Sequence, residues 1–89
     1  MYIKVKNLKG TSDNKPRGYN SWLEYWEEKK GKTASNCTNI NCRNSSILGG
    51  HVKKVFGGNE WYITPLCYSC NNSNDEFYVE ETNLLRVNQ

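Results

Sequence analysis

The four cysteines of the chain form two closely spaced pairs, and this spacing constrains the fold more than any other feature. Cys37 and Cys42 enclose four residues, Cys67 and Cys70 enclose two, and the 24 residues 43–66 separate the pairs. Both spacings are those of metal-binding turns. Four thiolates in this arrangement are typical of a tetrahedral zinc site that is coordinatively closed and therefore structural.

Two disulfides or four unpaired thiols are the alternatives to a zinc site. The first six residues, 1–6, contain no apolar run of the length found in a signal peptide, and no stretch is long enough to span a membrane. We therefore expect a cytoplasmic protein without membrane contact, in which reduced cysteines bind zinc rather than pair with one another.

The size of the chain also favours a metal. A chain of 89 residues with 36% hydrophobic residues and a mean hydropathy of −0.86 has a thin core. Three Trp, six Tyr and two Phe offset this partly, because each aromatic side chain buries a large area. The expected fold class is a single small α+β domain that zinc stabilises.

A helix is predicted at 21–30. Ser21 is a good N-cap, Glu24 completes a capping box three residues later, and Gly31 is suited to end the helix. Trp22 and Trp26 lie four residues apart and share one helical face. We interpret this aromatic face as part of the core, with a base-stacking platform as the alternative.

The rest of the chain shows strand and turn signals. Apolar residues alternate with basic ones near the N-terminus, and glycines interrupt the middle of the chain. The predicted elements are a strand at 2–6, a loop at 10–20, a β-hairpin at 46–64, a short helix at 68–77 and a closing strand at 84–87. We expect residues 77–79 to pack back on the hairpin.

Two short motifs carry a resemblance to a known family. Gly50-His51-Val52 and the run Pro65-Leu66-Cys67-Tyr68-Ser69-Cys70-Asn71 resemble the HNH family in its cysteine-containing form, whose core is a treble-clef zinc finger. The resemblance covers residues 37–77. It implies a treble-clef, ββα core at 37–89 bound by four cysteines. It does not account for residues 1–36, whose strand, loop and aromatic helix we expect to pack on this core as an N-terminal addition.

The resemblance also implies candidate catalytic residues. His51 matches the general base of active members, and Asn71 matches the position that helps to hold a catalytic Mg²⁺ or Mn²⁺. However, Gly50 and Val52 cannot supply the metal ligand that flanks this histidine, and Tyr62 stands where the family has Asn. This pattern favours a protein that is not an enzyme, in which His51 packs or bonds backbone carbonyls and Asn71 bonds free amides at a helix start.

The distribution of charge along the chain bears on what kind of partner the protein binds. Residues 1–58 hold 11 Lys and Arg against 4 Asp and Glu, whereas residues 59–89 hold 1 against 5. An ordinary solvated surface is one explanation, and a polyanionic partner is the other. The candidate phosphate contacts are Arg43, Lys53 and Lys54 near the hairpin, with Lys29, Lys30 and Lys32 at the helix end.

We therefore predict a zinc-stabilised, non-catalytic module that binds DNA or RNA. The first alternative is an HNH-like, metal-dependent endonuclease with His51 as general base. The second is a zinc module that binds a protein partner through exposed aromatic residues.

Overall fold

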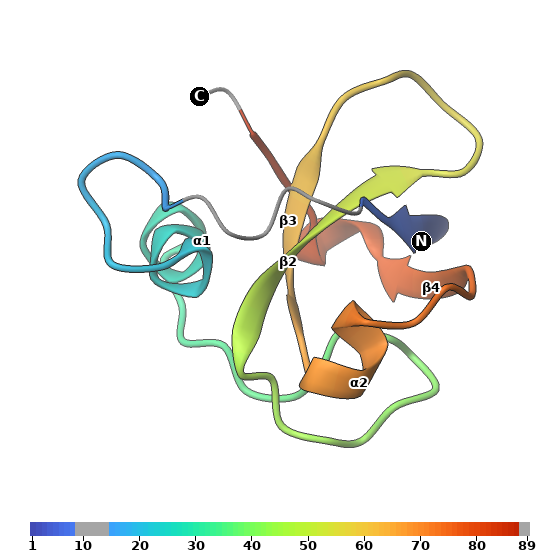
Figure 1. The fold of residues 1–89 in the computed structure, drawn as a ribbon, viewed down its shortest axis with the longest axis horizontal. Helices are drawn as coiled ribbons and strands as arrows, with labels where there is room; N and C mark the ends of the chain where they lie inside the picture. Colours follow the sequence, from blue (N-terminus) through green and yellow to red (C-terminus); the bar gives the residue numbers. More distant parts are fainter. Residues whose placement is uncertain (9–14, 88–89) are drawn as a thin grey trace.

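The fold is a five-stranded antiparallel sheet with one helix on each of its faces (Figure 1). The computed structural model describes residues 1–8 and 15–87. Its elements are the strands β1 (Tyr2–Asn7), β2 (Leu48–Lys54), β3 (Tyr62–Leu66), β4 (Phe77–Glu80) and β5 (Leu85–Arg86), the helices α1 (Trp22–Lys30) and α2 (Tyr68–Asn71), and the 3₁₀ turn η1 (Glu81–Asn83).

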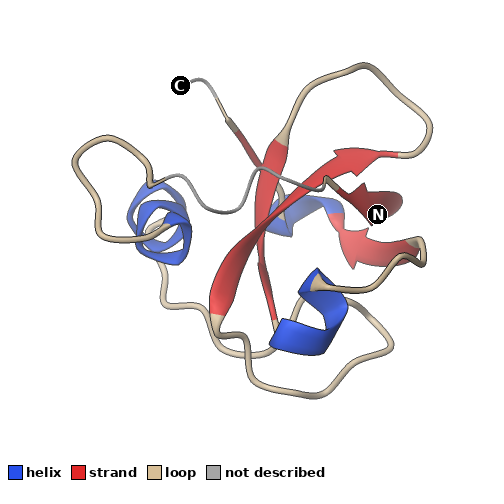
Figure 2. Cartoon of the chain, in the orientation of Figure 1, coloured by secondary structure: helices blue, strands red, loops and turns tan. Residues whose placement is uncertain are grey.

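The sheet has the strand order β4-β1-β2-β3-β5, so the N-terminal strand lies inside it. β4 and β5 follow one another in the chain and are joined by η1, yet they lie at opposite edges. The sheet must curl to bring its edges together, and the strands wrap around one side of the molecule (Figure 2). Within the described residues, no helix is both long and apolar enough to cross a membrane.

Alternation along the strands separates two faces of the sheet. Residues directly opposite in register share a face, as do residues two apart along a strand. The inner face carries the main core, and the outer face carries lysines as well as apolar residues. By register, the inner face holds Ile3, Val5, Val52, Leu66, Phe77 and Val79, and the outer face holds Lys4, Lys6, His51, Lys53, Ile63 and Tyr78.

Helix α1 covers only part of the outer face. The Ser21 side chain accepts a hydrogen bond of 3.1 Å from the Glu24 amide, and Gly31 ends the helix in the left-handed conformation at φ 69°. These caps confirm the predicted helix. Tyr25 and Trp26 are buried, and the Trp26 indole donates to the Asn83 carbonyl at 2.9 Å. The aromatic face is therefore core, as expected.

The start of α1 lies almost in contact with the backbone of β2. A Cβ atom at Gly49 would lie 2.7 Å from the Trp22 carbonyl carbon and 2.8 Å from the Leu23 nitrogen. Only glycine fits here without displacing the helix. The glycine pair therefore continues the strand instead of interrupting it.

The α+β class is confirmed, but the predicted treble clef is not, because the core is a curled five-stranded antiparallel sheet. The structure has the predicted hairpin, in which His51 lies opposite Ile63, together with the predicted strands near both ends of the chain. The helix predicted at 68–77 begins at Tyr68 as expected, but its predicted length is wrong, because α2 ends at Asn71 and β4 begins at Phe77. β4 pairs with β1, and its Phe77 and Val79 belong to the same core cluster as Val52 and Leu66 of the hairpin, in agreement with the prediction. Residues 10–14 of the predicted loop lie outside the described residues.

Candidate metal centre

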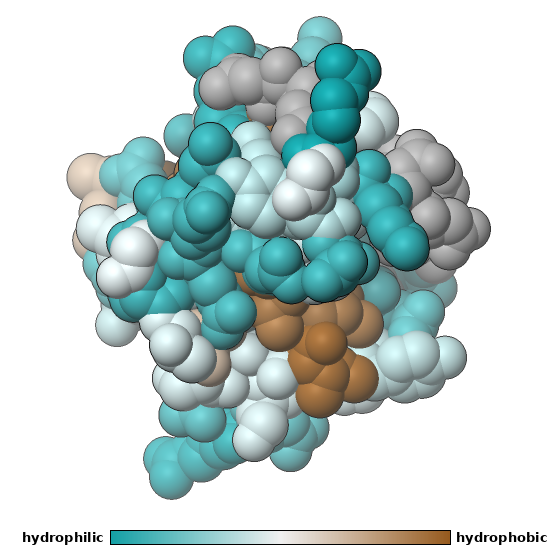
Figure 3. All heavy atoms as spheres, turned by 90° about the vertical axis from the view of Figure 1, so that its left-hand side faces the viewer, coloured by the Kyte–Doolittle hydropathy of each residue, from teal (hydrophilic) through white to brown (hydrophobic). Residues whose placement is uncertain are grey.

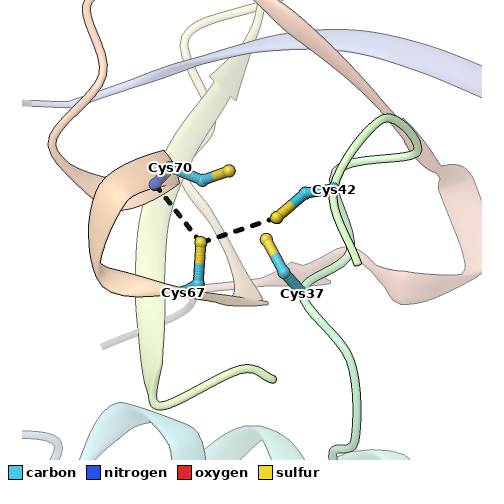
Figure 4. Close-up of side chains that lie close together, drawn as sticks. All are labelled: Cys37, Cys42, Cys67 and Cys70. Atoms are coloured by element: carbon cyan, nitrogen blue, oxygen red, sulfur yellow. Dashed lines mark hydrogen bonds between the residues drawn. The ribbon is translucent and has the colours of Figure 1, made fainter. Parts of the chain in front are cut away.

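The four cysteine sulfur atoms converge at one point between the first knuckle and α2 (Figure 4). All four Sγ atoms lie within 4.8 Å of one another, and none is in a disulfide. Cys37 and Cys67 are buried, while Cys42 and Cys70 are half-buried. The cluster is thus positioned to hold a metal ion, as the spacing predicted.

The first pair belongs to a compact turn that is docked on β3. The Cys42 amide donates to the Asn39 carbonyl at 2.9 Å, which closes the knuckle. Thr38 fixes the knuckle to the sheet, because both its amide and its hydroxyl lie 2.9 Å from the Pro65 carbonyl oxygen. Its hydroxyl also meets that of Thr64 at 2.7 Å. Local turn chemistry and strand β3 therefore place the first two sulfurs together.

The second pair lies at the start of α2. Cys67 is the N-cap of this helix, and its sulfur accepts a hydrogen bond of 3.4 Å from the Cys70 amide. One turn of helix brings Cys70 back beside Cys67. On the far side of α2, the Asn7 side chain donates to the carbonyls of Cys70 and Ser73 at 2.8 and 3.0 Å. Strand β1 thus helps to hold the helix that presents these ligands.

Polar neighbours favour the thiolate form of Cys67. Burial alone raises its pKa, but hydrogen bonds from the Ser69 hydroxyl and the Cys70 amide outweigh burial and lower the pKa to about 6. Burial raises the pKa of Cys37 and of Cys70. The Asn39 side-chain amide lies 3.4 Å from the Cys70 sulfur and supplies a compensating donor. Such donors to metal-bound sulfur orient the ligands and tune their basicity.

The donor set and its dimensions fit a tetrahedral ion. A Zn–S bond of about 2.3 Å implies sulfur–sulfur edges of about 3.8 Å. The Cys42 and Cys67 sulfurs are 3.7 Å apart, which matches such an edge and is far longer than a disulfide bond of about 2.05 Å. Four thiolates complete the coordination of such an ion and leave no position for water or substrate.

His51 lies away from the metal cluster, on the outer face beneath α1. It is 2% exposed, and its ring packs edge-to-face against Trp22 and Trp61, with centroid separations of 4.8 and 6.0 Å. Its Nδ1 atom has no hydrogen-bond partner among the described residues, and burial lowers its pKa. The ring is neutral, packed and closed to solvent.

Asn71 does not share a site with His51. A Cβ atom at Gly50, which points to the inner face, would lie 2.9 Å from the Asn71 Oδ1 atom. His51 follows Gly50 in β2 and therefore points to the opposite face. The strand separates the two residues that the HNH resemblance pairs.

The structure separates the three predicted nucleic-acid-binding residues. Arg43 is exposed just after the first knuckle. Lys53 points to the outer face, whereas Lys54 belongs to the inner-face register, where its Nζ lies 3.7 Å from Glu81 and 5.1 Å from the Tyr62 ring centroid. Lys6 is the neighbour that the sequence reasoning missed: it lies directly opposite Lys53. Strand alternation indicated its face, but the pairing of β1 with β2 was not visible.

Comparison of the chain with protein-family models, with curated proteins and with solved structures finds no match.

Proposed function

We propose that this protein is a zinc-structured, non-catalytic module that binds nucleic acid through the outer face of its sheet. Zinc is the ion that best suits four thiolates in a closed tetrahedral site. The order of parts, a cysteine knuckle, a hairpin and a cysteine pair at a helix start, supports an HNH-like plan. The sheet extends this plan well beyond a treble-clef core.

The observation that carries the proposal is an uncompensated pair of lysines. Lys6 and Lys53 lie directly opposite in the β1–β2 register, and no acidic group within the described residues forms an ion pair with either. Like charges in such positions destabilise a sheet by a few tenths of a kcal/mol or more. By contrast, Lys4 and Lys54 have the acidic partners Glu76 and Glu81. A phosphate backbone would supply the missing counter-charge.

The burial of His51 weighs against the endonuclease alternative. A general base must come within hydrogen-bond distance of the water it activates. The His51 ring is closed between two tryptophans, and Asn71 lies across the strand from it. The neighbouring Gly49 and Gly50 accommodate α1 and Leu66 instead of a catalytic ion.

The test is a salt titration of binding with charge variants. Each phosphate contact contributes about 0.7 to the slope of log K against log salt for a single strand and about 0.9 for a duplex. The double variant Lys6→Gln, Lys53→Gln should lower the slope by about 1.4 to 1.8. Its thermal stability should be equal to or above that of the wild type, since a repulsion is removed. Lys15→Gln, which removes an exposed charge at the groove between α1 and α2, is the matched control.

Unchanged binding by the double variant, or equal losses in the double variant and the control, would contradict the proposal. Cleavage of the nucleic acid that requires Mg²⁺ and is lost in His51→Ala would instead establish a nuclease.

A groove favours protein binding as a second candidate function. It encloses about 390 Å³ between the start of α1 and α2, and its apolar lining includes Trp22, Ile47, Leu48 and Tyr68. Ile47 and Tyr68 are 61% and 68% exposed. The face that carries α1 is mostly hydrophilic with one apolar patch (Figure 3). Ile47→Asp would abolish capture of a protein partner at this groove and leave nucleic-acid binding unchanged.

A further inference from the structure

Trp61 occupies an unusual position at the boundary between the covered and open parts of the outer face. It directly precedes β3, and its place two residues before Ile63 directs its side chain to that face. Its carbonyl accepts a hydrogen bond of 2.9 Å from the Val87 amide. The residue is nevertheless 43% exposed. A large aromatic surface is thus held at a fixed place and left partly in solvent.

The ring of Trp61 is supported from below by His51. The two rings meet edge-to-face at 6.0 Å, and His51 in turn meets Trp22 of α1 at 4.8 Å. These three rings form a chain from the helix to the surface. Because His51 is only 2% exposed, Trp61 packs against a ring that is itself buried in the protein. An aromatic side chain that is already in place binds a ligand with a smaller loss of conformational entropy.

A hollow of about 320 Å³ lies beside Trp61, and its lining is both apolar and polar. Arg86, Asn59 and Glu60 border it together with Trp61 and Val87. The hollow therefore sets the Trp61 ring beside an amide and a carboxylate, whereas Arg86, which also borders it, lies opposite Tyr62 in the inner-face register. These groups are the ones that stack on a nucleobase and bond its edges.

The lysine pair continues the same surface. The β2–β3 pairing ends with Val52 opposite Tyr62, and Lys53 and Trp61 are the next residues beyond this last pair on the two segments. Lys6 follows on β1, opposite Lys53. The outer face thus presents one aromatic group and two cationic groups in a row across three adjacent chain segments.

We infer that Trp61 and the hollow beside it form a docking site for an unpaired nucleobase, so that the nucleic acid accepted by this surface is single-stranded. The inference rests on the proposed function, because the lysine pair is taken as the phosphate contact. Bases within a duplex are stacked on one another and have no free face to offer an aromatic ring. A single strand places a base on Trp61 while its phosphates run past Lys53 and Lys6.

The experiment measures fluorescence anisotropy of a labelled single-stranded oligonucleotide and of its duplex with the zinc-loaded full chain. Trp61→Ala should weaken single-strand binding about fivefold or more, while duplex binding stays at its weaker level. Trp61→Phe, which keeps a ring, should retain most of the affinity. Tyr68→Ala removes a 68% exposed aromatic from α2 and should have no effect. Circular dichroism confirms that each variant is folded.

The outcomes separate the inference from the proposed function. If the lysine variant loses binding while Trp61→Ala binds as the wild type does, the base site is overturned and the proposed function stands. Tighter binding of the duplex than of the single strand overturns the inference in the same way. If the wild type binds neither nucleic acid, or binds an acidic polypeptide equally well without dependence on Trp61, both proposals fail.

Discussion

Replacement of Gly49 by alanine tests how α1 is seated on the sheet. The new Cβ would lie 2.7 Å from the Trp22 carbonyl carbon and 2.8 Å from the Leu23 nitrogen, whereas ordinary contact begins at 3.4 Å. Both obstacles are backbone atoms, so the helix start itself must move by about 0.7 Å, which is the difference between 2.7 and 3.4 Å. Such overpacking costs about 1–3 kcal/mol. In a domain of this size, the melting temperature should fall by about 4–8 °C for each kcal/mol.

Thermal unfolding followed by circular dichroism, at a fixed excess of zinc, measures this effect. Gly57→Ala is the matched control, because its nearest neighbour is the Lys54 Cβ atom at 3.3 Å in an exposed loop. It should change the free energy of unfolding by less than about 0.5 kcal/mol. Equal melting temperatures for the two variants would refute the close seating of α1 on β2. The same result would contradict the close packing of Trp22 on His51, which depends on this position of the helix.

Two further predictions concern the metal and the buried histidine. Chelation of the proposed zinc ion, or Cys67→Ser, should unfold the chain. A structural zinc ion contributes about 10–16 kcal/mol, whereas small domains are stable by only about 5–15 kcal/mol. Retained far-ultraviolet dichroism without metal would contradict this. Burial lowers the pKa of His51 below 6.5. As the pH falls, this histidine therefore takes up a proton in the unfolded chain before it does so in the folded one. The free energy of unfolding should decrease below pH 6.5, by at most about 1.4 kcal/mol per pH unit. Urea titrations across this range should show a shallower fall in His51→Phe, and parallel profiles would exclude the histidine as the cause.

The metal cluster and α1 were predictable because their signals are local. The spacing of Cys67 and Cys70 specifies one turn, and Ser21 and Gly31 mark the two ends of a helix. The length of α2 was not predictable in the same way. Asn7, from 63 residues earlier in the chain, bonds the Cys70 carbonyl at the end of this helix.

The residues that meet on the outer face also could not be predicted from local sequence. Alternation in β1 indicates that Lys4 and Lys6 share a face, but only the register shows that Lys6 opposes Lys53. The motif around His51 resembles a catalytic one, whereas the burial of this residue depends on Trp22 and Trp61 from two other segments. Contacts between distant segments, rather than local pattern, decide which residues form a site here.

The interior position of β1 has a consequence for how the chain assembles. Tyr2 lies opposite Glu80, so the first strand is completed only when almost the last part of the chain is available. The cysteines, in contrast, all lie between residues 37 and 70, and the metal can close that loop early. Pairings between such distant residues slow folding because a long loop must close before they form. We expect a metal-nucleated hairpin to form first, with entry of the N-terminal strand between β2 and β4 as the slow step.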